Sequence, residues 1–134
     1  MIMKILLADP HPESQSALRL TLVARIPQVS EVCEAGSAMQ LLAQCAQACP
    51  DLILFDLDLA YPPRSIAQAR PRQPLADLIG VLRRLCPTAR VVAMSSRFEG
   101  KQEALAAGAS GFISKTDPPD TVLSGIIQFL EDRP

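Results

Sequence analysis

The sequence predicts an α/β domain: a doubly wound parallel sheet of five strands, covered by helices on both faces, which gives three layers. Short apolar runs of β type alternate along the chain with amphipathic segments of helix length, a pattern typical of strand–helix units. The run 52–55 is apolar at every residue, as expected for a central strand covered on both faces. With 134 residues, the chain is long enough for a core of its own, so we expect residues 1–134 to form a single domain.

Strands and helices are expected to follow one another in strict alternation. The expected strands are residues 4–8, 29–35, 52–55, 90–94 and 111–114, and the expected helices are residues 13–25, 38–49, 75–86, 100–107 and 118–131. Prolines at positions 27, 50 and 87 end the first three helices, because proline lacks the N–H that a helix needs. Ser37 is the expected N-cap of the second helix, and Gly108 suits the left-handed backbone that ends the fourth.

The segment at about 59–74 departs from this pattern. It is rich in proline and arginine: Pro62, Pro63, Arg64, Arg70, Pro71, Arg72 and Pro74. Loops of this length without secondary structure are uncommon in compact domains, and those that occur are often functional or mobile. Three interpretations stay open: the loop covers the preceding strand end, supplies Arg64 or Arg70 to a site, or is disordered.

The overall charge argues against several classes of function. The chain has 13 Lys and Arg against 14 Asp and Glu, a net charge of −1, and its basic residues are spread along the sequence. A nucleic-acid-binding face needs clustered basic residues, so we expect no direct nucleic-acid binding by this domain. No apolar stretch reaches the roughly 20 residues of a membrane span, and the chain start is too short for a signal peptide, so we expect a cytoplasmic domain without membrane binding.

The four cysteines show no pairing signal. They stand at positions 33, 45, 49 and 86, without a Cys-x-x-Cys motif. Four cysteines could form two disulfides, but cytosolic α/β domains usually carry them as reduced, small apolar side chains. We therefore expect the thiols to be free.

Four of the five expected strands end in a polar side chain that can take part in chemistry: Asp9, Asp56, Ser95 and Lys115. In an open parallel sheet, ligands bind outside the carboxyl ends of the strands, where side chains from separate segments meet. Alone, Asp56 could equally cap a helix or lie in a solvated turn. As part of this set, its carboxylate could attack a phosphoryl group and form an aspartyl-phosphate. That transfer needs a divalent cation, a fixed positive charge and a hydroxyl, which Asp9, Lys115 and Ser95 could provide.

Four motifs carry a resemblance to a known family. They are KILLADPHP at 4–12, PDLILFD at 50–56, VVAMSS at 91–96 and GASGFISK at 108–115. With these motifs the chain resembles, over essentially its whole length, the receiver domains of two-component response regulators, and most closely those of the LuxR or NarL type. The resemblance implies a flavodoxin-like (βα)5 fold with strand order 2-1-3-4-5.

The resemblance also implies individual roles for the strand-end residues. Asp56 would be the phospho-acceptor, Asp9 would hold Mg²⁺ through water, Asp58 would offer Mg²⁺ its backbone carbonyl, Ser95 and Lys115 would contact phosphoryl oxygens, and Phe112 would be the aromatic switch that turns inward with Ser95. On the residues alone, Phe112 could equally be an ordinary core aromatic.

The same resemblance implies partners. A histidine kinase or phosphotransfer protein would donate the phosphoryl group. The fourth helix, fifth strand and last helix would form the surface that switches and that could support a homodimer. A C-terminal DNA-binding effector domain, outside this chain, would give a transcriptional output. The domain would not be an enzyme beyond self-phosphorylation and autodephosphorylation at Asp56.

Position 10 departs from the family pattern. The family usually carries a second acidic residue there, which is the direct metal ligand. Pro10 offers neither charge nor a side-chain oxygen, so Mg²⁺ binding should weaken. His11 could replace that ligand, but we interpret it as a surface or turn histidine. The loop at 59–74 is the second departure, because the family has a much shorter turn there.

Three interpretations of the function follow. Because Asp56, Ser95 and Lys115 are retained, we favour a receiver whose phosphorylation is weakened at the metal. Pro10 instead favours a phosphorylation-independent pseudo-receiver that serves as an interaction module. Residues 53–58 also resemble the nucleophile motif of haloacid-dehalogenase-type phosphatases, but Leu59 and Ala60 do not match that motif and it is not on the first strand.

Overall fold

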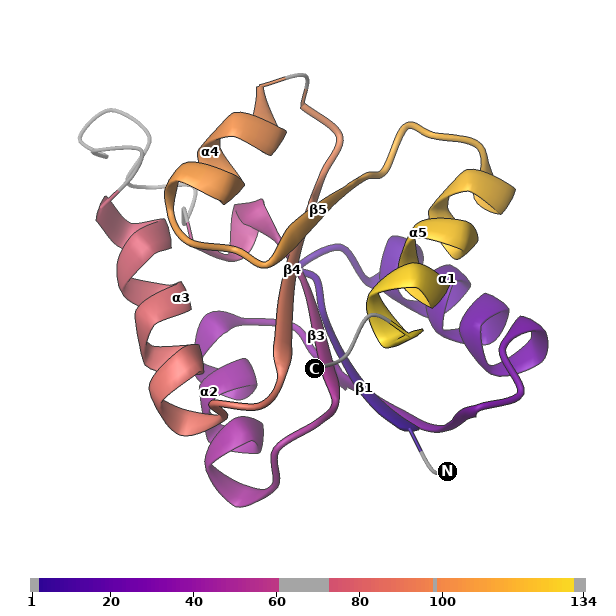
Figure 1. Ribbon diagram of the computed structural model, residues 1–134, viewed down its shortest axis with the longest axis horizontal. Helices are drawn as coiled ribbons and strands as arrows, with labels where there is room; N and C mark the ends of the chain where they lie inside the picture. Colours follow the sequence, from indigo (N-terminus) through magenta and orange to yellow (C-terminus); the bar gives the residue numbers. More distant parts are fainter. Residues whose placement is uncertain (1–2, 61–72, 98, 132–134) are drawn as a thin grey trace.

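The computed structural model describes residues 3–60, 73–97 and 99–131 (Figure 1). Its strands are β1 (Met3–Ala8), β2 (Val29–Ala35), β3 (Leu52–Asp56), β4 (Arg90–Ser95) and β5 (Gly111–Ser114). Its helices are α1 (Pro12–Arg25), α2 (Ala38–Gln47), α3 (Gln73–Leu85), α4 (Gly100–Ala106) and α5 (Pro119–Glu131), with a short 3-10 helix η1 (Leu57–Ala60) after β3. The predicted alternation of strands and helices is confirmed.

The five strands form one parallel sheet in the order β2-β1-β3-β4-β5, as the resemblance implied. The register sets which strand ends lie level with each other. Ala8 in β1 pairs with Phe55 in β3, so the next residues, Asp9 and Asp56, leave the sheet side by side. At the other pair of strands, Ser95 in β4 is level with Ser114 in β5. Sheet register alone therefore brings the expected site residues to one edge.

Helices cover both faces of the sheet, which gives three layers (Figure 1). Helices α1 and α5 lie on one face and α2, α3 and α4 on the other. The central strand β3 is buried at every residue and alternates between the two cores: Ile53 and Phe55 pack towards the α2–α4 side, Leu52 and Leu54 towards the α1–α5 side. Among the described residues, no helix is long and apolar enough to cross a membrane.

Several element boundaries differ from the expected ones by one or two residues. Helix α2 ends at Gln47 instead of residue 49, because the backbone becomes extended at Ala48. Its predicted N-cap is confirmed: the Ser37 hydroxyl accepts the Gln40 N–H at 3.2 Å. The expected 59–74 loop is shorter at both ends, since residues 59–60 belong to η1 and residues 73–74 to α3. The three interpretations of that loop concern residues outside the described ranges.

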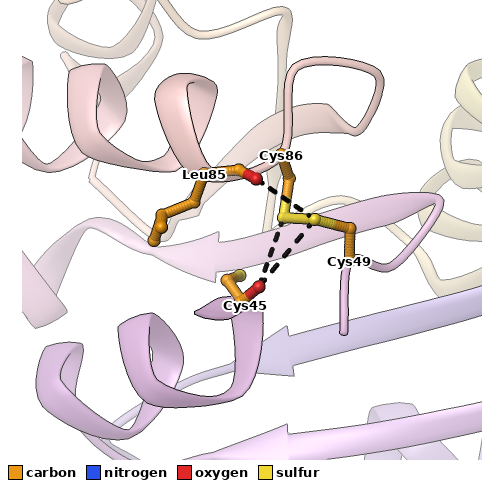
Figure 2. The surroundings of a disulfide bond; sticks show 4 residues. All are labelled: Cys45, Cys49, Leu85 and Cys86. Atoms are coloured by element: carbon orange, nitrogen blue, oxygen red, sulfur yellow. Dashed lines mark hydrogen bonds between the residues drawn. A yellow bond between two sulfur atoms is a disulfide. The ribbon is translucent and has the colours of Figure 1, made fainter. Parts of the chain in front are cut away.

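The expectation of four free thiols is wrong. Cys49 and Cys86 form a disulfide, with their Cα atoms 5.5 Å apart, while Cys33 and Cys45 are free (Figure 2). Cys49 follows the end of α2 and Cys86 follows the end of α3, and both helices end at the same edge of the sheet. The pair is 37 residues apart in sequence, so no local motif announces it. The two sulfurs lie 3.8 and 3.7 Å from the Cys45 carbonyl oxygen.

Candidate functional site

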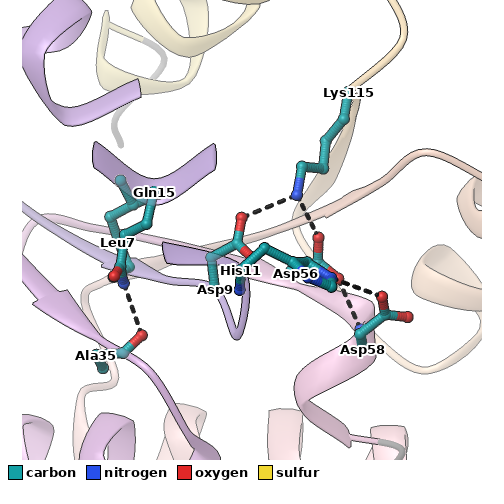
Figure 3. A network of polar contacts seen from close by, with 8 residues as sticks. All are labelled: Leu7, Asp9, His11, Gln15, Ala35, Asp56, Asp58 and Lys115. Carbon is teal, nitrogen blue, oxygen red and sulfur yellow. Dashed lines mark hydrogen bonds and ion pairs between the residues drawn. The ribbon is translucent and has the colours of Figure 1, made fainter. Parts of the chain in front are cut away.

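Lys115, Asp9 and Asp56 form an ion-pair cluster at the carboxyl edge of the sheet (Figure 3). The Lys115 Nζ donates hydrogen bonds to Asp9 Oδ2 at 2.8 Å and to Asp56 Oδ2 at 2.7 Å. These residues come from the ends of β5, β1 and β3, which are far apart in the chain. The structure thus brings together three of the four strand-end residues that the sequence singled out.

Both carboxylates are buried: Asp9 is 2% exposed and Asp56 is 3% exposed. Two negative charges so close together, away from water, are stable only with a counter-charge. Burial would lower the pKa of Lys115, but the hydrogen bonds and negative charges of Asp56 and Asp9 more than offset it and raise the pKa above its ordinary 10.5. Lys115 therefore stays protonated at neutral pH and supplies a positive charge to the cluster.

Backbone N–H groups hold the remaining oxygen of each carboxylate. The His11 N–H donates to Asp9 Oδ1 at 2.8 Å, and the Asp58 N–H donates to Asp56 Oδ1 at 2.8 Å. In both cases the donor is two residues after the acceptor, as in a turn closed by an aspartate side chain. Each carboxylate is therefore held between its own turn and Lys115, which fixes its direction.

Gln15 is a buried polar side chain that the sequence reasoning missed. Its Nε2 in α1 donates to the Leu7 carbonyl at 3.1 Å and to the Ala35 carbonyl at 2.8 Å (Figure 3). The Ala35 carbonyl also accepts the Asp9 N–H at 3.0 Å. Gln15 thus fixes the ends of β1 and β2 where the Asp9 turn begins. Its only sequence signal is a polar residue on the inner face of an amphipathic helix.

Ser95 lies at the same edge but outside the ion-pair cluster. It is 3% exposed, and its hydroxyl accepts the Arg97 N–H at 3.0 Å. Among the described residues, that hydroxyl makes no hydrogen bond to Asp56 or Lys115. The Ser95 carbonyl accepts the Lys115 N–H at 2.9 Å, so the two residues are linked through the backbone.

Gly100, the first residue of α4, lies between the two expected switch residues. A Cβ at this position would come within 3.0 Å of Ser95 Oγ and 3.3 Å of Phe112 Cε1. Phe112 is half-buried and packs against the core on the α2–α4 side, so it is neither a fully buried core residue nor free in solvent. Sequence reasoning used Gly100 only as a helix start and missed this close approach.

The site offers donors for a metal ion. The ring of His11 and the carboxylates of Asp9 and Asp56 each place one possible ligand atom within 4.8 Å of the others. Carboxylate oxygens fit Mg²⁺, which the fold family implies, and the Asp58 backbone could add a carbonyl. Pro10 adds no oxygen, so the oxygen set is smaller than Mg²⁺ sites usually use. His11 is exposed, as expected of a turn histidine, and its Nε2 lies 3.1 Å from Asp58 Oδ2.

Comparison with known proteins identifies relatives of this chain. No protein-family model matches it. Two curated proteins of Pseudomonas putida do: the glycerol metabolism activator is 33% identical over 132 residues, and the transcriptional activator protein ExaE is 34% identical over 130 residues. These matches cover 95% and 96% of this chain but 53% and 55% of the two relatives. The chain therefore spans about half the length of the curated relatives it matches.

Solved structures show the same fold over almost the whole chain. A LuxR family DNA-binding response regulator from Silicibacter pomeroyi is 25% identical, with a TM-score of 0.72 over 98% of this chain and 93% of that one. The chain has the fold of response-regulator receiver domains. The receiver domain of the regulator NarL from Mycobacterium tuberculosis superposes with a TM-score of 0.73, 22% identity and 98% coverage of both chains. A two-component response regulator of the LuxR family from Aurantimonas sp. SI85-9A1 reaches 0.76, with 24% identity over 99% of this receiver and 88% of that chain.

The receiver fold agrees with what the sequence motifs implied about the family. The structural neighbours of the chain include receivers of the LuxR and NarL type. Receiver domains are in general signalling modules and not enzymes, and they typically bind Mg²⁺ in an acidic pocket. This chain has a group of Asp9, His11 and Asp56 that could hold a metal ion.

Proposed function

We propose that the domain accepts a phosphoryl group on Asp56 from a phosphohistidine of a histidine kinase or phosphotransfer protein. An Asp56 oxygen attacks the phosphorus, the donor's P–N bond breaks, and the donor histidine takes the electron pair. One observation carries the proposal: the Lys115 ammonium lies 2.7 Å from Asp56 and 2.8 Å from Asp9. An ammonium fixed there can neutralise charge on a phosphoryl oxygen without rearranging.

Ser95 is the proposed contact for a second phosphoryl oxygen. To reach the phosphoryl group, its hydroxyl has to leave the Arg97 N–H. Because Gly100 fits closely against both Ser95 and Phe112, a shift of Ser95 changes the space available to α4 and to the Phe112 ring. We therefore propose Ser95 and Phe112 as the switch, with α4, β5 and α5 as the surface that responds.

Mg²⁺ is the proposed cofactor, held by Asp9, Asp56 and the Asp58 backbone carbonyl. When bound, it would supply positive charge against the transferring phosphoryl group. Since Pro10 removes one oxygen ligand, we propose that Mg²⁺ binds weakly and that phosphorylation is slow for this reason.

The proposed output is control of transcription. The two curated relatives are named as activators and are about twice as long as this chain, which supports a DNA-binding effector domain as the partner of the receiver. With a net charge of −1, the receiver itself is proposed to make no direct contact with nucleic acid or membrane, and to act in the cytoplasm, where two-component phosphoryl donors are found. A homodimer through α4, β5 and α5 is the proposed form of the active state.

A phosphorylation-independent pseudo-receiver is the second candidate. Pro10 supports it, because a receiver that cannot hold a cation cannot be phosphorylated efficiently. In that case the same α4–β5–α5 surface would bind its partner without a switch.

Incubation with acetyl phosphate and Mg²⁺, followed by intact-mass measurement, tests the proposal. The wild type is expected to gain one phosphoryl group, and Asp56→Asn none. A wild type that stays unmodified at saturating donor would overturn the proposal in favour of the pseudo-receiver. Multiple turnovers of a generic phosphate ester would overturn both and support a phosphatase, whereas we expect only self-phosphorylation and autodephosphorylation at Asp56.

A further inference from the structure

His11 is the only histidine of the chain, and it lies inside the acidic site. Its backbone is fixed at the entrance of the site, because its N–H donates to Asp9 Oδ1 at 2.8 Å and it forms the N-cap of α1. A ring nitrogen lies within 4.8 Å of a carboxylate oxygen of both Asp9 and Asp56. His11, the residue after Pro10, thus offers a ring nitrogen to the site, whereas the family's acidic residue at position 10 offers an oxygen.

The donor set decides which ions the site can select. Mg²⁺ is a hard cation that prefers six oxygens and loses its water reluctantly. Imidazole instead suits first-row transition metals, whose affinities for a mixed nitrogen and oxygen site rise along the series towards Cu²⁺ and Zn²⁺. Two carboxylates with one imidazole therefore bind Mg²⁺ weakly and a transition-metal dication more tightly.

Asp58 provides independent support for a ligand role of His11. Its Oδ2 lies 3.1 Å from the His11 Nε2 (Figure 3). Metal-binding histidines commonly donate one ring N–H to a carboxylate, which orients the ring and makes the other nitrogen a better ligand. In the tautomer in which Nε2 donates to Asp58, the lone pair is on Nδ1.

We propose that the acidic site prefers a first-row transition-metal dication over Mg²⁺, with His11 as the third ligand beside Asp9 and Asp56. The inference rests on the proposed function, since it names the cation that would support phosphoryl transfer to Asp56. It corrects the interpretation of His11 as a turn histidine without a ligand role.

The required rearrangement is moderate. Two ligands of one tetrahedral zinc ion are about 3.4 Å apart, since each bond is about 2.0–2.2 Å long. The ligand atoms here lie within 4.8 Å, so a closure of about 1.4 Å at most is enough. The His11 side chain can make this movement, because 55% of its surface is exposed. Lys115 keeps its place, since each carboxylate oxygen has two lone pairs and the structure uses one of them.

The test compares Zn²⁺ and Mg²⁺ binding to the untagged chain in a Cys33→Ser background, which removes the more exposed free thiol as a competing zinc ligand. Calorimetry gives both dissociation constants, and a long-range ¹H–¹⁵N spectrum reports on the single imidazole. We expect Zn²⁺ to move the resonance of one imidazole nitrogen and Mg²⁺ to leave both in place. His11→Ala should raise the Zn²⁺ dissociation constant at least about tenfold and leave that of Mg²⁺ unchanged.

Two further variants sharpen the comparison. Glu13→Gln removes an exposed charge from the first turn of α1 outside the cluster and should leave both dissociation constants unchanged. Pro10→Asp restores a carboxylate beside Asp9 and should tighten Mg²⁺ binding at least about tenfold, which brings the two ions closer in affinity.

The outcomes separate this inference from the proposed function. Zn²⁺ binding that is unaffected by His11→Ala, or an imidazole spectrum that Zn²⁺ does not change, overturns the ligand role of His11 even if acetyl phosphate modifies Asp56. Conversely, a His11-dependent Zn²⁺ site supports the inference even if Asp56 stays unmodified with Zn²⁺, Mn²⁺ and Mg²⁺ alike. An Asp56 that stays unmodified with all three ions overturns only the proposed phosphoryl transfer.

Discussion

Lys115 is the residue on which the stability of the site depends most. Among the described residues, it is the cation that contacts both buried carboxylates, and its pKa is raised above 10.5 by them. A raised pKa means that the folded state holds the proton more tightly than the unfolded state. The stabilisation is therefore complete below the ordinary pKa and disappears as the pH rises through the raised value.

Replacing Lys115 by methionine tests how much protonated Lys115 stabilises the folded state. Lys115→Met keeps the length of the side chain but removes the ammonium that contacts Asp9 and Asp56, so we expect a loss of about 2–3 kcal/mol in the free energy of unfolding at neutral pH. Urea unfolding at a series of pH values should show this difference constant up to about pH 10 and shrinking in more alkaline solution. A difference that grows with pH would contradict the assigned role.

At the level of the elements, α5 packs closely against β5 at Gly111. A Cβ at Gly111 would lie 2.1 Å from Phe129 Cζ and 2.3 Å from Phe129 Cε1, which is less than any van der Waals contact allows. The ring of Phe129 therefore occupies the space that a side chain at position 111 would need. Only glycine lets α5 approach the strand that carries Phe112 and ends at Lys115.

Gly111→Ala is therefore expected to destabilise the domain by about 1–3 kcal/mol, because the ring or the helix must shift. Gly80→Ala in α3 is the matched control. Its Cβ would meet only Arg84 Nη1 at 3.8 Å, so it should stabilise the helix by up to about 1 kcal/mol. Combining Gly111→Ala with Phe129→Ala should recover part of the loss in the free energy of unfolding. If the losses of the two single variants simply add in the double variant, as measured by chemical unfolding, the contact is excluded.

The disulfide joins two further elements, α2 and α3, at the edge of the sheet opposite the acidic site. For a closed segment of 37 residues, the chain-entropy description gives a stabilisation of about 4 kcal/mol. We expect chemical unfolding of the oxidised protein to need that much more free energy than unfolding after reduction with dithiothreitol.

Matched variants define the source of that difference. Cys33→Ser should show the same effect of reduction as the wild type, whereas Cys49→Ser should show none. Thiol titration under denaturing, non-reducing conditions should count two free thiols in the wild type, those of Cys33 and Cys45. Four free thiols after oxidation would contradict the disulfide.

At the scale of the whole molecule, the features predicted correctly are those that repeat along the chain. The strand–helix alternation and the positions of Asp9 and Asp56 at one edge follow from periodicity and from the geometry of parallel sheets, whereas the strand order was implied by the family resemblance. The positions of the helix ends were predicted less accurately, because the last turn of α2 depends on tertiary packing as well as on local propensity.

The features that the sequence left undetermined depend on contacts between distant segments. Gln15 matters because α1 brings it to the ends of two strands, and Gly100 because α4 starts against Ser95 and Phe112. The Cys49–Cys86 bond joins two helix ends that are 37 residues apart in the chain. No local pattern distinguishes these residues from others of their type, so only the folded arrangement reveals them.

The same disulfide changes the covalent topology of the chain. It closes residues 49–86 into a ring, and Asp56 is a member of that ring. A single backbone cut inside the ring, for example at an engineered protease site at 61–72, leaves one covalent molecule in which β3 is still attached to both halves. A cut outside the ring separates two fragments at once. On gels, the first product should therefore split into two bands only after reduction, and the nicked domain should keep its two halves at a fixed stoichiometry.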